Sequence, residues 1–586
     1  MCGIAGIMTR TGTAPDPALI ERFKRDLRHR GPDGDGIHAS GNLAMVQTRL
    51  AIIDLETGDQ PLVEPGGAAL IANGEIYNYV ELRQELSDVA FATQSDCEPP
   101  LYLYRRRGLE FASALRGMYA LAIHDPAQEL LLLARDPFGI KPLYYVEGPD
   151  YFAFASEPRA LINAGLAKAD IVPERRDELL QLQFTCGRET IFRRINRVLP
   201  GETLVVRDAR VVDRHRISAL PDAGAPATPA DEALDRLDAA LEDSVRLHQR
   251  SDVPYGLFLS GGVDSSVVLA MMARLNDRPV RTYTVGFSGT RVADERAHAR
   301  EMARLVGAEH TEIEFDEEDF RTLLPRIVAD MDDPAADYAI LPSWKLARTA
   351  ARDLKVVLSG EGGDELFAGY GRYRSLSRPW WLGGRSIRAK GIFDGRGVLR
   401  NNNTTWRDGI TAAEVTAARP ARTRLQVAQA TDCADWLPND LLTKLDRCLM
   451  AHGLEGRTPL LDPAVANVAF NLPDELKLRD RLGKWLLRSW LARAMPDAKP
   501  FERKRGFTVP VGEWILKDGK RLGKLVSACP AIQEIAWPDA VARLYSTDGK
   551  RAGFAAWTLL FYALWHRRHI EGIDPGGSVL DVLSAR

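Results

Sequence analysis

Several features are scarce in this sequence, and each absence narrows the class of protein. Only six cysteines occur in 586 residues, with no C-x-x-C pair and no zinc-like spacing to histidine. No apolar run reaches the roughly 18 residues that a membrane-spanning helix needs. No charged segment and apolar run precede Cys2 to act as a secretory signal. We therefore expect reduced thiols, no membrane partner and a cytoplasmic location.

An excess of charge of either sign is also lacking. The formal net charge is −3 at pH 7, with 27% charged and 45% hydrophobic residues, which is typical of a globular protein. Nucleic acid is therefore not an expected partner on charge grounds. The length indicates two or more domains, because single hydrophobic cores stop growing beyond about 250–300 residues.

The first third of the chain has the rhythm of a sheet-rich domain. From residue 1 to about residue 208, short apolar runs such as LAMVQTRLAIID and AALIANGEIYN are separated by Gly, Pro, Asn and Asp. This spacing predicts many short strands. Helical periodicity occurs only near 17–28 and 78–87. Residues 209–229 form a connecting segment that ends in a Pro-, Ala- and Gly-rich stretch typical of a linker.

A second domain follows, over residues 230–586. The strand-like runs YGLFLS, RTYTVGF, HTEIEF and KVVLS alternate with helical patterns, which predicts a mostly parallel sheet with ligands at the carboxyl ends of its strands. Beyond about Asp432 the chain is mainly helical. An insertion near 372–430 contains an arginine-rich stretch with tryptophans, 372–407. Such a stretch can bind nucleic acid, but we favour a solvated surface insertion.

Cys2 occupies a position where chain ends usually fray. Four interpretations of this position compete. The cysteine has no role, anchors a lipid, begins a buried edge strand, or acts as a nucleophile. The lipid interpretation fails because no signal segment precedes it. If Met1 is removed, as the small neighbours Cys2 and Gly3 allow, the α-amine of Cys2 has an ordinary pKa of about 8 and can serve as base for its own thiol.

Two glycine-rich loops indicate a phosphate site. Residues 260–266, SGGVDSS, stand between a strand and a helix, where backbone N–H groups and the helix dipole favour an anion. The spacing is neither a P-loop nor a dinucleotide fingerprint. The loop 359–365, SGEGGDE, follows another strand. If the strands are neighbours, Asp264 and Asp364 converge on the phosphates as Mg²⁺ ligands, and Glu361 faces the reacting group.

Other residues of the first domain suit a small amino-acid amide. Asn73 and Gly74 offer the two kinds of donor that hold a tetrahedral oxyanion. Arg49 can grip an α-carboxylate, and Asp96 or Glu75 an α-ammonium. Each has an ordinary alternative: Arg49 as a surface ion pair, and Asn73-Gly74 as a hairpin turn.

The motifs taken together resemble two known domain families. Those of the first domain are MCGIAGI, RHRGPDG (28–34), RLAIID (49–54), NGEIYNY (73–79), SDCE (95–98) and RDPFGIKPLYY (135–145). They resemble the glutaminase domain of class II glutamine amidotransferases. Those of the second are SGGVDSS (260–266), LSGEGGDELFAGY (358–370), KLDRCLMAHGLEGRTPLLD (444–462) and KWLLR (484–488). They resemble the synthetase domain of glutamine-hydrolysing asparagine synthetases.

The resemblance implies an α/β and α+β protein of two domains. An αββα Ntn-hydrolase sandwich over residues 1–208 would precede a parallel-sheet α/β ATP-pyrophosphatase domain with a helical C-terminal part. The implied activity is an ATP-dependent carbon–nitrogen ligase: Cys2 releases ammonia from glutamine, the second domain adenylates aspartate, and ammonia gives asparagine, with AMP and pyrophosphate. ATP and Mg²⁺ are the implied substrate and cofactor, and a homodimer is the family-level expectation.

Residue by residue, the resemblance assigns roles to matching positions. The implied catalytic residues are Cys2, Asn73, Gly74, Glu361 and Lys484. Glutamine would be held by Arg49, Ile52, Asn73, Gly74, Glu75 and Asp96. ATP would be held by Leu259, Ser260, Gly261, Gly262, Asp264, Ser265, Val285, Ser359 and Gly360. The metal ligands would be Asp264 and Asp364.

Some positions depart from the asparagine-forming pattern near the expected acceptor site. Gly453, Gly456 and Thr458 stand where Ser, Val and Val are common, and Ala339 where Ser is common. Aspartate is the favoured acceptor. The alternative is an amidotransferase of the same architecture that acts on another carboxylate, from a peptide, a polysaccharide precursor or a secondary metabolite. A non-catalytic scaffold is a third interpretation, disfavoured because the candidate catalytic residues are present.

Overall fold

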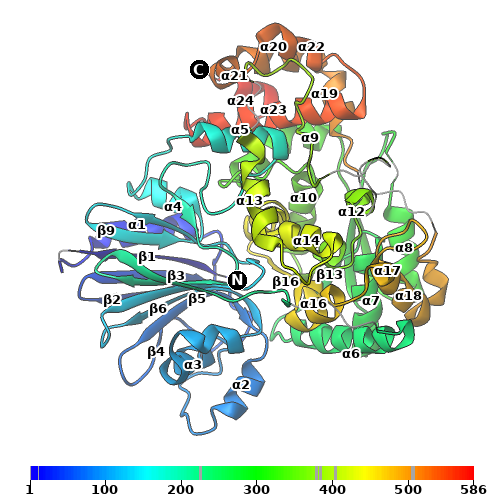
Figure 1. The fold of residues 1–586 in the computed structure, drawn as a ribbon. Coiled ribbons are helices and arrows are strands. Elements are labelled where there is room, and N and C mark those ends of the chain that lie inside the picture. Colours follow the sequence, from blue (N-terminus) through cyan, green and yellow to red (C-terminus); the bar gives the residue numbers. More distant parts are fainter. Residues whose placement is uncertain are drawn as a thin grey trace.

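The computed structural model describes residues 2–10, 12–222, 228–292, 294–376, 381, 386–401, 405–502 and 508–585. Figure 1 shows a β-rich domain at the left, a domain with a parallel sheet at the right, and the last helices of the chain at the top. The marked N-terminus lies on the side of the β-rich domain that faces its neighbour. The expected two-domain division is therefore present.

The first domain is a sandwich of two antiparallel sheets. Their strand orders are β10-β8-β9-β1-β3-β2 and β12-β11-β7-β6-β5-β4. The strands of the first sheet are β1 (Gly3–Thr9), β2 (Gly34–Ser40), β3 (Leu43–Arg49), β8 (Tyr144–Glu147), β9 (Tyr151–Ala155) and β10 (Asn196–Arg197). Those of the second are β4 (Leu62–Val63), β5 (Ala69–Ile76), β6 (Gly117–Asp125), β7 (Leu130–Arg135), β11 (Glu202–Arg207) and β12 (Arg210–Arg216).

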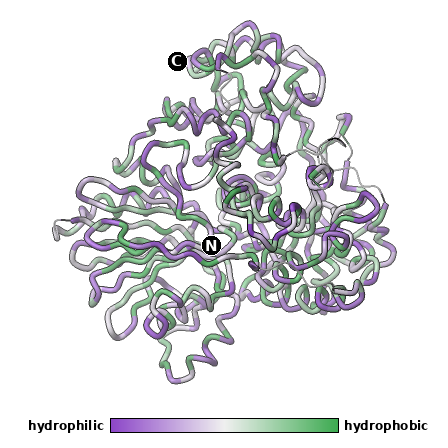
Figure 2. The backbone as a smooth tube through the Cα atoms, viewed as in Figure 1, coloured by the Kyte–Doolittle hydropathy of each residue, from purple (hydrophilic) through white to green (hydrophobic). Residues whose placement is uncertain are grey.

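Alternation along the strands separates the layers of this sandwich. In β1, Ile4 and Met8 pack between the sheets, while Ala5 and Ile7 pack under helices. The helices α1 (Pro17–Leu27) and α4 (Pro158–Asn163) cover the first sheet, and α2 (Tyr79–Glu85) and α3 (Pro99–Arg107) cover the second. Figure 2 shows hydrophobic stretches running along these strands. The expected αββα layering and the helices near 17–28 and 78–87 are confirmed.

The boundary of the first domain lies later than residue 208. Strand β12 pairs with β11 from Glu202↔Arg216 to Arg207↔Arg210, so the second sheet extends to Arg216. The sequence hid this strand because its polar residues RVVDRHR break the apolar run. Of the expected linker, residues 223–227 lie outside the described part of the chain. Helix α6 (Ala230–His248) then opens the second domain.

The second domain is built on a five-stranded parallel sheet with the order β15-β14-β13-β16-β17. Its strands are β13 (Tyr255–Phe258), β14 (Arg281–Gly286), β15 (Glu309–Glu314), β16 (Val356–Leu358) and β17 (Glu455–Arg457). The first four match the predicted strands. Since β13 has β14 on one side and β16 on the other, the chain reverses its strand order there, which is the usual place for a ligand.

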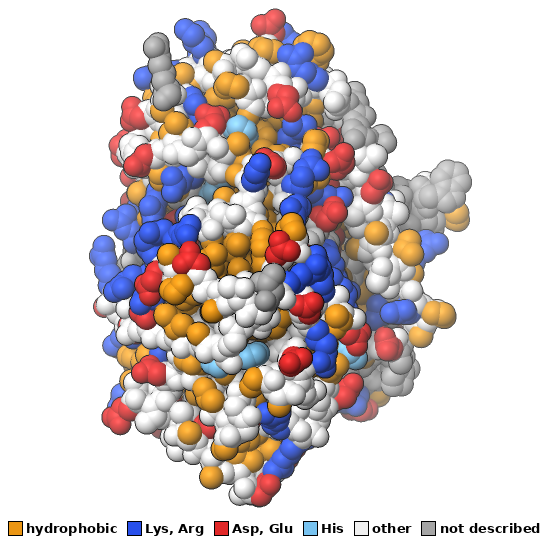
Figure 3. Space-filling view, turned by 90° about the vertical axis from the view of Figure 1, so that its left-hand side faces the viewer, with side chains coloured by type: hydrophobic (Ala, Val, Ile, Leu, Met, Phe, Trp, Pro, Cys, Tyr) orange, Lys and Arg blue, Asp and Glu red, His pale blue; other side chains and the backbone are white. Residues whose placement is uncertain are grey.

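Helices surround this sheet and dominate the end of the chain. They include α7 (Val263–Leu275), α8 (Arg296–Leu305), α10 (Ile340–Ala350), α15 (Leu442–Met450), α18 (Trp485–Ala494), α19 (Val511–Lys517) and α23 (Lys550–His569). The expected helical C-terminal part is thereby confirmed. Within the described ranges, none of the helices combines the length and the apolar character needed to cross a membrane. Basic and acidic side chains are interspersed over the face that Figure 3 shows.

The arginine-rich stretch 372–407 is only in part the solvated surface insertion that its composition predicts, because Trp381 and Lys390 are exposed but other residues are covered. Ile387, Phe393 and Val398 are buried, and Arg372 forms an ion pair with Asp432 at 2.8 Å. Arginines of this stretch can be covered because aromatic faces and carboxylates interact favourably with the guanidinium group. Residues 377–380, 382–385 and 402–404 of this stretch are outside the described ranges.

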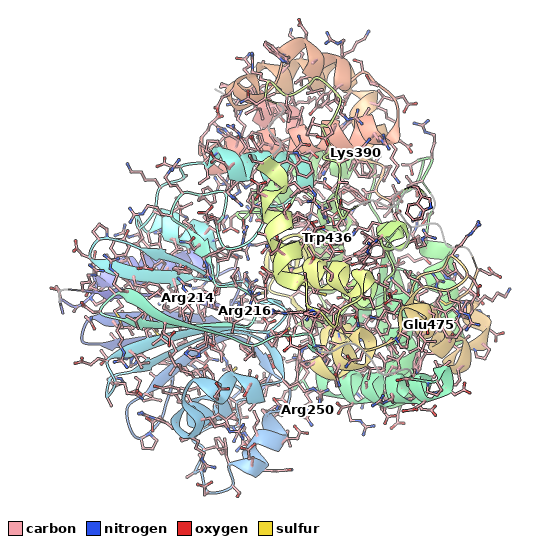
Figure 4. The ribbon with its side chains drawn as sticks, viewed as in Figure 1. Arg214, Arg216, Arg250, Lys390, Trp436 and Glu475 are labelled. Atoms are coloured by element: carbon pink, nitrogen blue, oxygen red, sulfur yellow. The ribbon has the colours of Figure 1, made fainter. Side chains whose placement is uncertain are left out.

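The two domains share a buried network of opposite charges. Arg30 of the first domain is fully buried; it donates to both carboxylate oxygens of Asp446 on α15, at 2.8 and 3.0 Å, and to Glu157 at 2.9 Å. At the lower boundary in Figure 4, Arg250 donates to both oxygens of Glu81 at 2.7 Å. The buried pair of Arg30 and Asp446 favours this docking, because a misdocked arrangement leaves one charge buried alone, whereas the more exposed pair of Arg250 and Glu81 contributes less.

We expect Arg30→Met to destabilise the protein by about 3–5 kcal/mol, because it leaves Asp446 and Glu157 without their buried partner. The measurement is the midpoint of thermal unfolding. Arg25→Met is the matched control, since its side chain is 70% exposed and exposed substitutions change stability by only about 0.5 kcal/mol. Equal midpoints for the two variants would contradict the role of the network.

Candidate active sites

The first candidate site lies at one end of the sandwich, between its two sheets. Cys2 directly precedes β1, a central strand of the first sheet, and Asn73 stands on β5 of the second. The backbone N–H of Cys2 donates to Oδ1 of Asn73 at 3.1 Å. Burial raises the pKa of the Cys2 thiol, so the resting group is a thiol that needs a base before it can attack. Met1 itself is outside the described residues.

A free donor points into this site. Since Oδ1 of Asn73 accepts from Cys2, its Nδ2 is left buried without any partner. A buried amide donor without a partner is costly unless something else accepts its hydrogen bond. Gly74 follows at a place where no side chain fits, because a Cβ there would lie 2.1 Å from the carbonyl oxygen of Met118. Asn73 and Gly74 therefore remain the candidates for an oxyanion hole.

The predicted glutamine-binding residues surround the same place. Arg49 follows Thr48, which pairs with Gly3; its guanidinium donates to Asp59 at 2.7 Å, and that carboxylate is 81% exposed and so free to leave. Ile52 is buried nearby. Burial raises the pKa of Asp96 to about 6, although its Oδ2 accepts a hydrogen bond from the N–H of Ile76 at 2.7 Å. A buried acid of this kind favours an incoming cation such as an α-ammonium.

We expect Asn73→Ala to lower the rate of glutamine hydrolysis by about 10²–10³-fold, because removal of one oxyanion donor costs that much. The loss should fall on kcat rather than KM, and is measured as glutamate release. Asn163→Ala, at an exposed position in α4, is the control. A wild-type kcat for Asn73→Ala would place the oxyanion elsewhere.

The second candidate site is a cavity of about 760 Å³ at the carboxyl ends of β13, β14 and β16. Most of the residues predicted to bind ATP line it. They are Leu259, Ser260, Asp264, Ser265, Val285, Ser359 and Gly360, with Glu361 and Asp364 beside them. Gly261 and Gly262 belong to the turn behind, where the N–H of Gly262 donates to Oγ of Ser260 at 3.1 Å. Helix α7 begins at the next residue, so its positive end faces the cavity.

The two glycine-rich loops pack directly against each other. A Cβ on Gly360 would lie 2.7 Å from the backbone N of Ser265, and one on Gly363 would lie 2.5 Å from Cγ of Asp264. Both contacts are shorter than real Cβ atoms tolerate. Glycine is therefore required at these positions for Asp264 and Asp364 to approach the same point, as the sequence predicted.

Lys484 holds those two carboxylates. Its Nζ forms an ion pair with Asp264 and lies 2.6 Å from Oδ1 of Asp364. The two aspartates raise the pKa of Lys484 even though burial acts in the opposite direction. The ammonium group therefore stays charged and keeps two like charges together in the absence of other cations. Among the described residues, no cluster of three or more His, Cys, Asp or Glu side chains forms a metal site without phosphate.

The residues at the far end of the cavity were not predicted from the sequence. Lys444 is buried there, with Nζ 3.3 Å from Asp337 and 3.6 Å from Oε1 of Glu361. Trp436 and Asp440 line the same end from η4, a π-helical segment (Asp432–Leu441). Lys444 is the first residue of the motif at 444–462, so the sequence offered a signal for it. Trp436 and Asp440 stand in a helical stretch, and the sequence does not reveal which way their side chains point.

Strand β17 connects the two sites. Its Arg457 lies 3.5 Å from Glu75 of the first site and 2.6 Å from Glu455. The carbonyl oxygen of Arg457 accepts a hydrogen bond from the N–H of Ser359 at 2.8 Å. One short strand thus contacts the glutamine-site acid and fixes the loop that lines the cavity.

The fold and the two sites define an amidotransferase joined to an ATP-dependent synthetase. Comparisons agree: residues 1–216 match the model of the glutamine amidotransferase domain, and residues 236–567 match the asparagine synthase model. The glutamine-hydrolysing asparagine synthetase 1 of Bacillus subtilis is 33% identical over 97% of each chain. Asparagine synthetase B of Escherichia coli is 30% identical, over 88% of this chain and 83% of that one. Amidase chry2 of Gibberella zeae is 33% identical over 65% and 61%.

The chain belongs to the asparagine synthase family. It is a carbon–nitrogen ligase with a glutamine amidotransferase domain, and ATP is a substrate of this family.

Proposed function

We propose that this protein makes asparagine from aspartate, glutamine and ATP, releasing glutamate, AMP and pyrophosphate. The observation that carries the proposal is the pairing, within one chain, of a buried thiol beside an unpartnered amide donor with a glycine-lined cavity that gathers Asp264, Asp364 and Glu361. The first arrangement suits release of ammonia from an amide. The second suits activation of a carboxylate by ATP, so one site can consume the product of the other. The cytoplasm would supply all three substrates.

In the first site, the thiolate of Cys2 attacks the side-chain amide carbon of glutamine. Nδ2 of Asn73 and the N–H of Gly74 stabilise the oxyanion, and ammonia leaves with a proton relayed through the α-amine of Cys2. Water then cleaves the thioester and frees glutamate. Arg49 would bind the α-carboxylate after releasing Asp59, and Asp96 with Glu75 the α-ammonium.

This mechanism requires a free amine at Cys2. The backbone nitrogen of Cys2 already lies 3.1 Å from Oδ1 of Asn73, which would hold such an amine close to the thiol. We therefore propose that the active protein begins at Cys2. Intact-mass measurement of active protein that retains Met1 would overturn the self-base step.

In the second site, a carboxylate oxygen of aspartate attacks the α-phosphorus of ATP, and pyrophosphate departs. Residues 259–266, Val285, Ser359 and Gly360 would bind the nucleotide, with pyrophosphate at the N-terminus of α7. The ammonium group of Lys484 would stabilise the negative charge that develops on the leaving pyrophosphate. Glu361, paired with Lys444, would assist formation of the acyl-adenylate or the attack of ammonia on it.

Asp264 and Asp364 fit a magnesium ion. Both are carboxylates at the phosphate end of the cavity, and hard oxygen ligands from carboxylate and phosphate are what Mg²⁺ prefers. When bound, Mg²⁺ would supply positive charge to the polyphosphate. These two side chains would hold it, and Lys484, which pairs with both of them, would add a fixed positive charge beside the phosphates.

Ammonia must reach the acyl-adenylate without a proton, because ammonium is not a nucleophile. A dry route between the sites is therefore required. Strand β17 lies between them, as its contacts to Glu75 and to Ser359 show, so the route would run along this strand.

The test is to incubate purified protein with glutamine, Mg-ATP and aspartate, and to follow asparagine, AMP and pyrophosphate. We expect the three products in equal amounts. Glutamine hydrolysis with AMP release that ignores aspartate would reject aspartate as the acceptor and keep an amidotransferase acting on another carboxylate. Absence of glutamine hydrolysis would favour a scaffold.

A further inference from the structure

Arg388 of the arginine-rich insertion forms no ion pair with any residue that the structure describes, although Asp432 and Asp440 lie close enough to act on its charge. Arg388 lines the cavity of the second domain, and its Nε is buried without a partner. Its Cζ lies 4.5 Å from the ring centre of Trp436 and 5.2 Å from that of Phe184. Its backbone has a φ of 46°, a left-handed conformation that a non-glycine residue holds only where the surroundings impose it.

The neighbouring arginine differs in this respect. Arg372 lies on the same indole ring, with Cζ 4.1 Å from the centre of Trp436. Its charge is neutralised by Asp432 at 2.8 Å. No described residue forms such an ion pair with Arg388, and burial, with Arg372 adding to it, lowers the pKa of Arg388. The guanidinium of Arg388 is thus available to bind an anion that enters the cavity.

Asp440, an acid with one unpartnered oxygen, lies at the N–H edge of the same indole. Oδ2 of Asp440 accepts a hydrogen bond from Nε1 of Trp436 at 2.7 Å, while Oδ1 is buried without a partner. Burial, and then Asp337, raises the pKa of Asp440 to about 7. An incoming cation would favour the charged carboxylate. Both residues belong to the π-helical segment η4, a rare geometry that often marks functional sites.

We propose that Arg388 and Asp440 form a subsite that reads the non-reacting end of the acceptor, namely the α-carboxylate and the α-ammonium of a free amino acid. The inference rests on the proposed function, since it concerns the same cavity. Glu361 and Lys444 occupy the reacting end, next to Ser359 and Gly360. The distal end then offers a guanidinium over the face of Trp436 and a carboxylate at its indole N–H, each with a buried polar atom that lacks a hydrogen-bond partner, which matches the adjacent charges of an α-amino acid.

The subsite also explains selectivity. An acceptor with only the reacting carboxylate would desolvate Arg388 and Asp440 without pairing them, and buried unpaired groups reject such analogues strongly. Aspartate carries both groups. Succinate lacks the ammonium, and β-alanine lacks the α-carboxylate. These two compounds therefore test the two residues separately.

The experiment measures acceptor-dependent pyrophosphate release with ammonia as nitrogen donor, for the wild type, Arg388→Gln and Asp440→Asn. We expect Arg388→Gln to raise the KM for aspartate about 10–100-fold, as loss of a charged hydrogen bond does. The kcat/KM for β-alanine should change by less than about threefold, because β-alanine never contacts Arg388. Asp440→Asn should lower the preference for aspartate over succinate in the same way.

The control is Lys390→Gln, which removes a positive charge from the same insertion. Lys390 is exposed and lies well apart from Trp436 in Figure 4, so aspartate kinetics should match the wild type. Unchanged glutamine hydrolysis reports correct folding of each variant. Should Arg388→Gln misfold, Arg388→Lys keeps the charge but loses the planar fork, and we expect an intermediate KM.

The outcomes separate this inference from the proposed function. If the wild type releases pyrophosphate with aspartate but Arg388→Gln keeps the wild-type ratio of aspartate to β-alanine, the subsite is overturned and the function stands. If the wild type does not respond to aspartate at all, the proposed function fails, and the amino-acid subsite with it.

Discussion

Cys2→Ala should abolish glutamine-dependent synthesis while synthesis from added ammonia continues at the wild-type rate. Loss of a covalent nucleophile typically lowers kcat by roughly 10⁴–10⁶-fold, because the group that forms the thioester is gone. The ammonia reaction is spared because the acyl-adenylate forms in the cavity of the second domain. The measurement is asparagine formed from each nitrogen donor, with glutamate followed in parallel.

Cys529→Ala is the matched control for this variant. Cys529 is also a buried free thiol, but it lies at the start of α21 (Pro530–Ile535) among the C-terminal helices. Cys529→Ala should form asparagine from glutamine and from added ammonia as the wild type does. Glutamate release by Cys2→Ala at more than a trace level would show that the nucleophile is another residue.

Glu361→Gln should produce the opposite pattern. It removes the negative charge 3.6 Å from Nζ of Lys444 while keeping the side-chain shape, so the carboxylate that assists the chemistry is lost without a cavity. General acid–base catalysis contributes about 10²–10⁴-fold, and synthesis from both nitrogen donors should fall by that factor. Glutamine hydrolysis should persist, measured as glutamate release.

Exposed Glu318→Gln on α9 (Glu317–Ala329) serves as the control. Exchange of labelled pyrophosphate into ATP in the presence of aspartate separates the two roles proposed for Glu361. Loss of exchange assigns it to formation of the acyl-adenylate, and retained exchange assigns it to the attack of ammonia. Undiminished asparagine synthesis by Glu361→Gln would remove Glu361 from the reaction.

The parts of both sites that could be predicted from sequence are those fixed by local chemistry. Gly360 was predictable because a glycine-rich loop directly after a strand is typical of a phosphate site, and the structure explains the glycine, since a Cβ there would lie 2.7 Å from the backbone N of Ser265. Cys2 and Asn73 stand out because their residue types suit one reaction. The sheet-rich first domain and the parallel sheet of the second followed from the lengths and alternation of apolar runs, whereas the sandwich was implied by the resemblance.

The remaining parts depend on contacts that no local pattern encodes. Strand β17 consists of Glu455, Gly456 and Arg457, whose charges argue against a buried strand until the contact of Arg457 with Glu75 is known. Arg388 was assigned to a solvated surface because arginine is rarely buried. Only the folded chain brings the faces of Trp436 and Phe184 over its guanidinium.

The charge network between the domains also bears on their modularity. Arg30, Arg116 and Arg197 of the first domain pair with Asp446, Asp462 and Asp333 of the second, each at 2.8 Å. Cation and anion thus come from opposite domains in every one of these pairs. A chain cut between the domains would leave two fragments with complementary charges on their docking surfaces. We therefore expect these surfaces to contribute to the recognition of one domain by the other, in addition to the peptide connection.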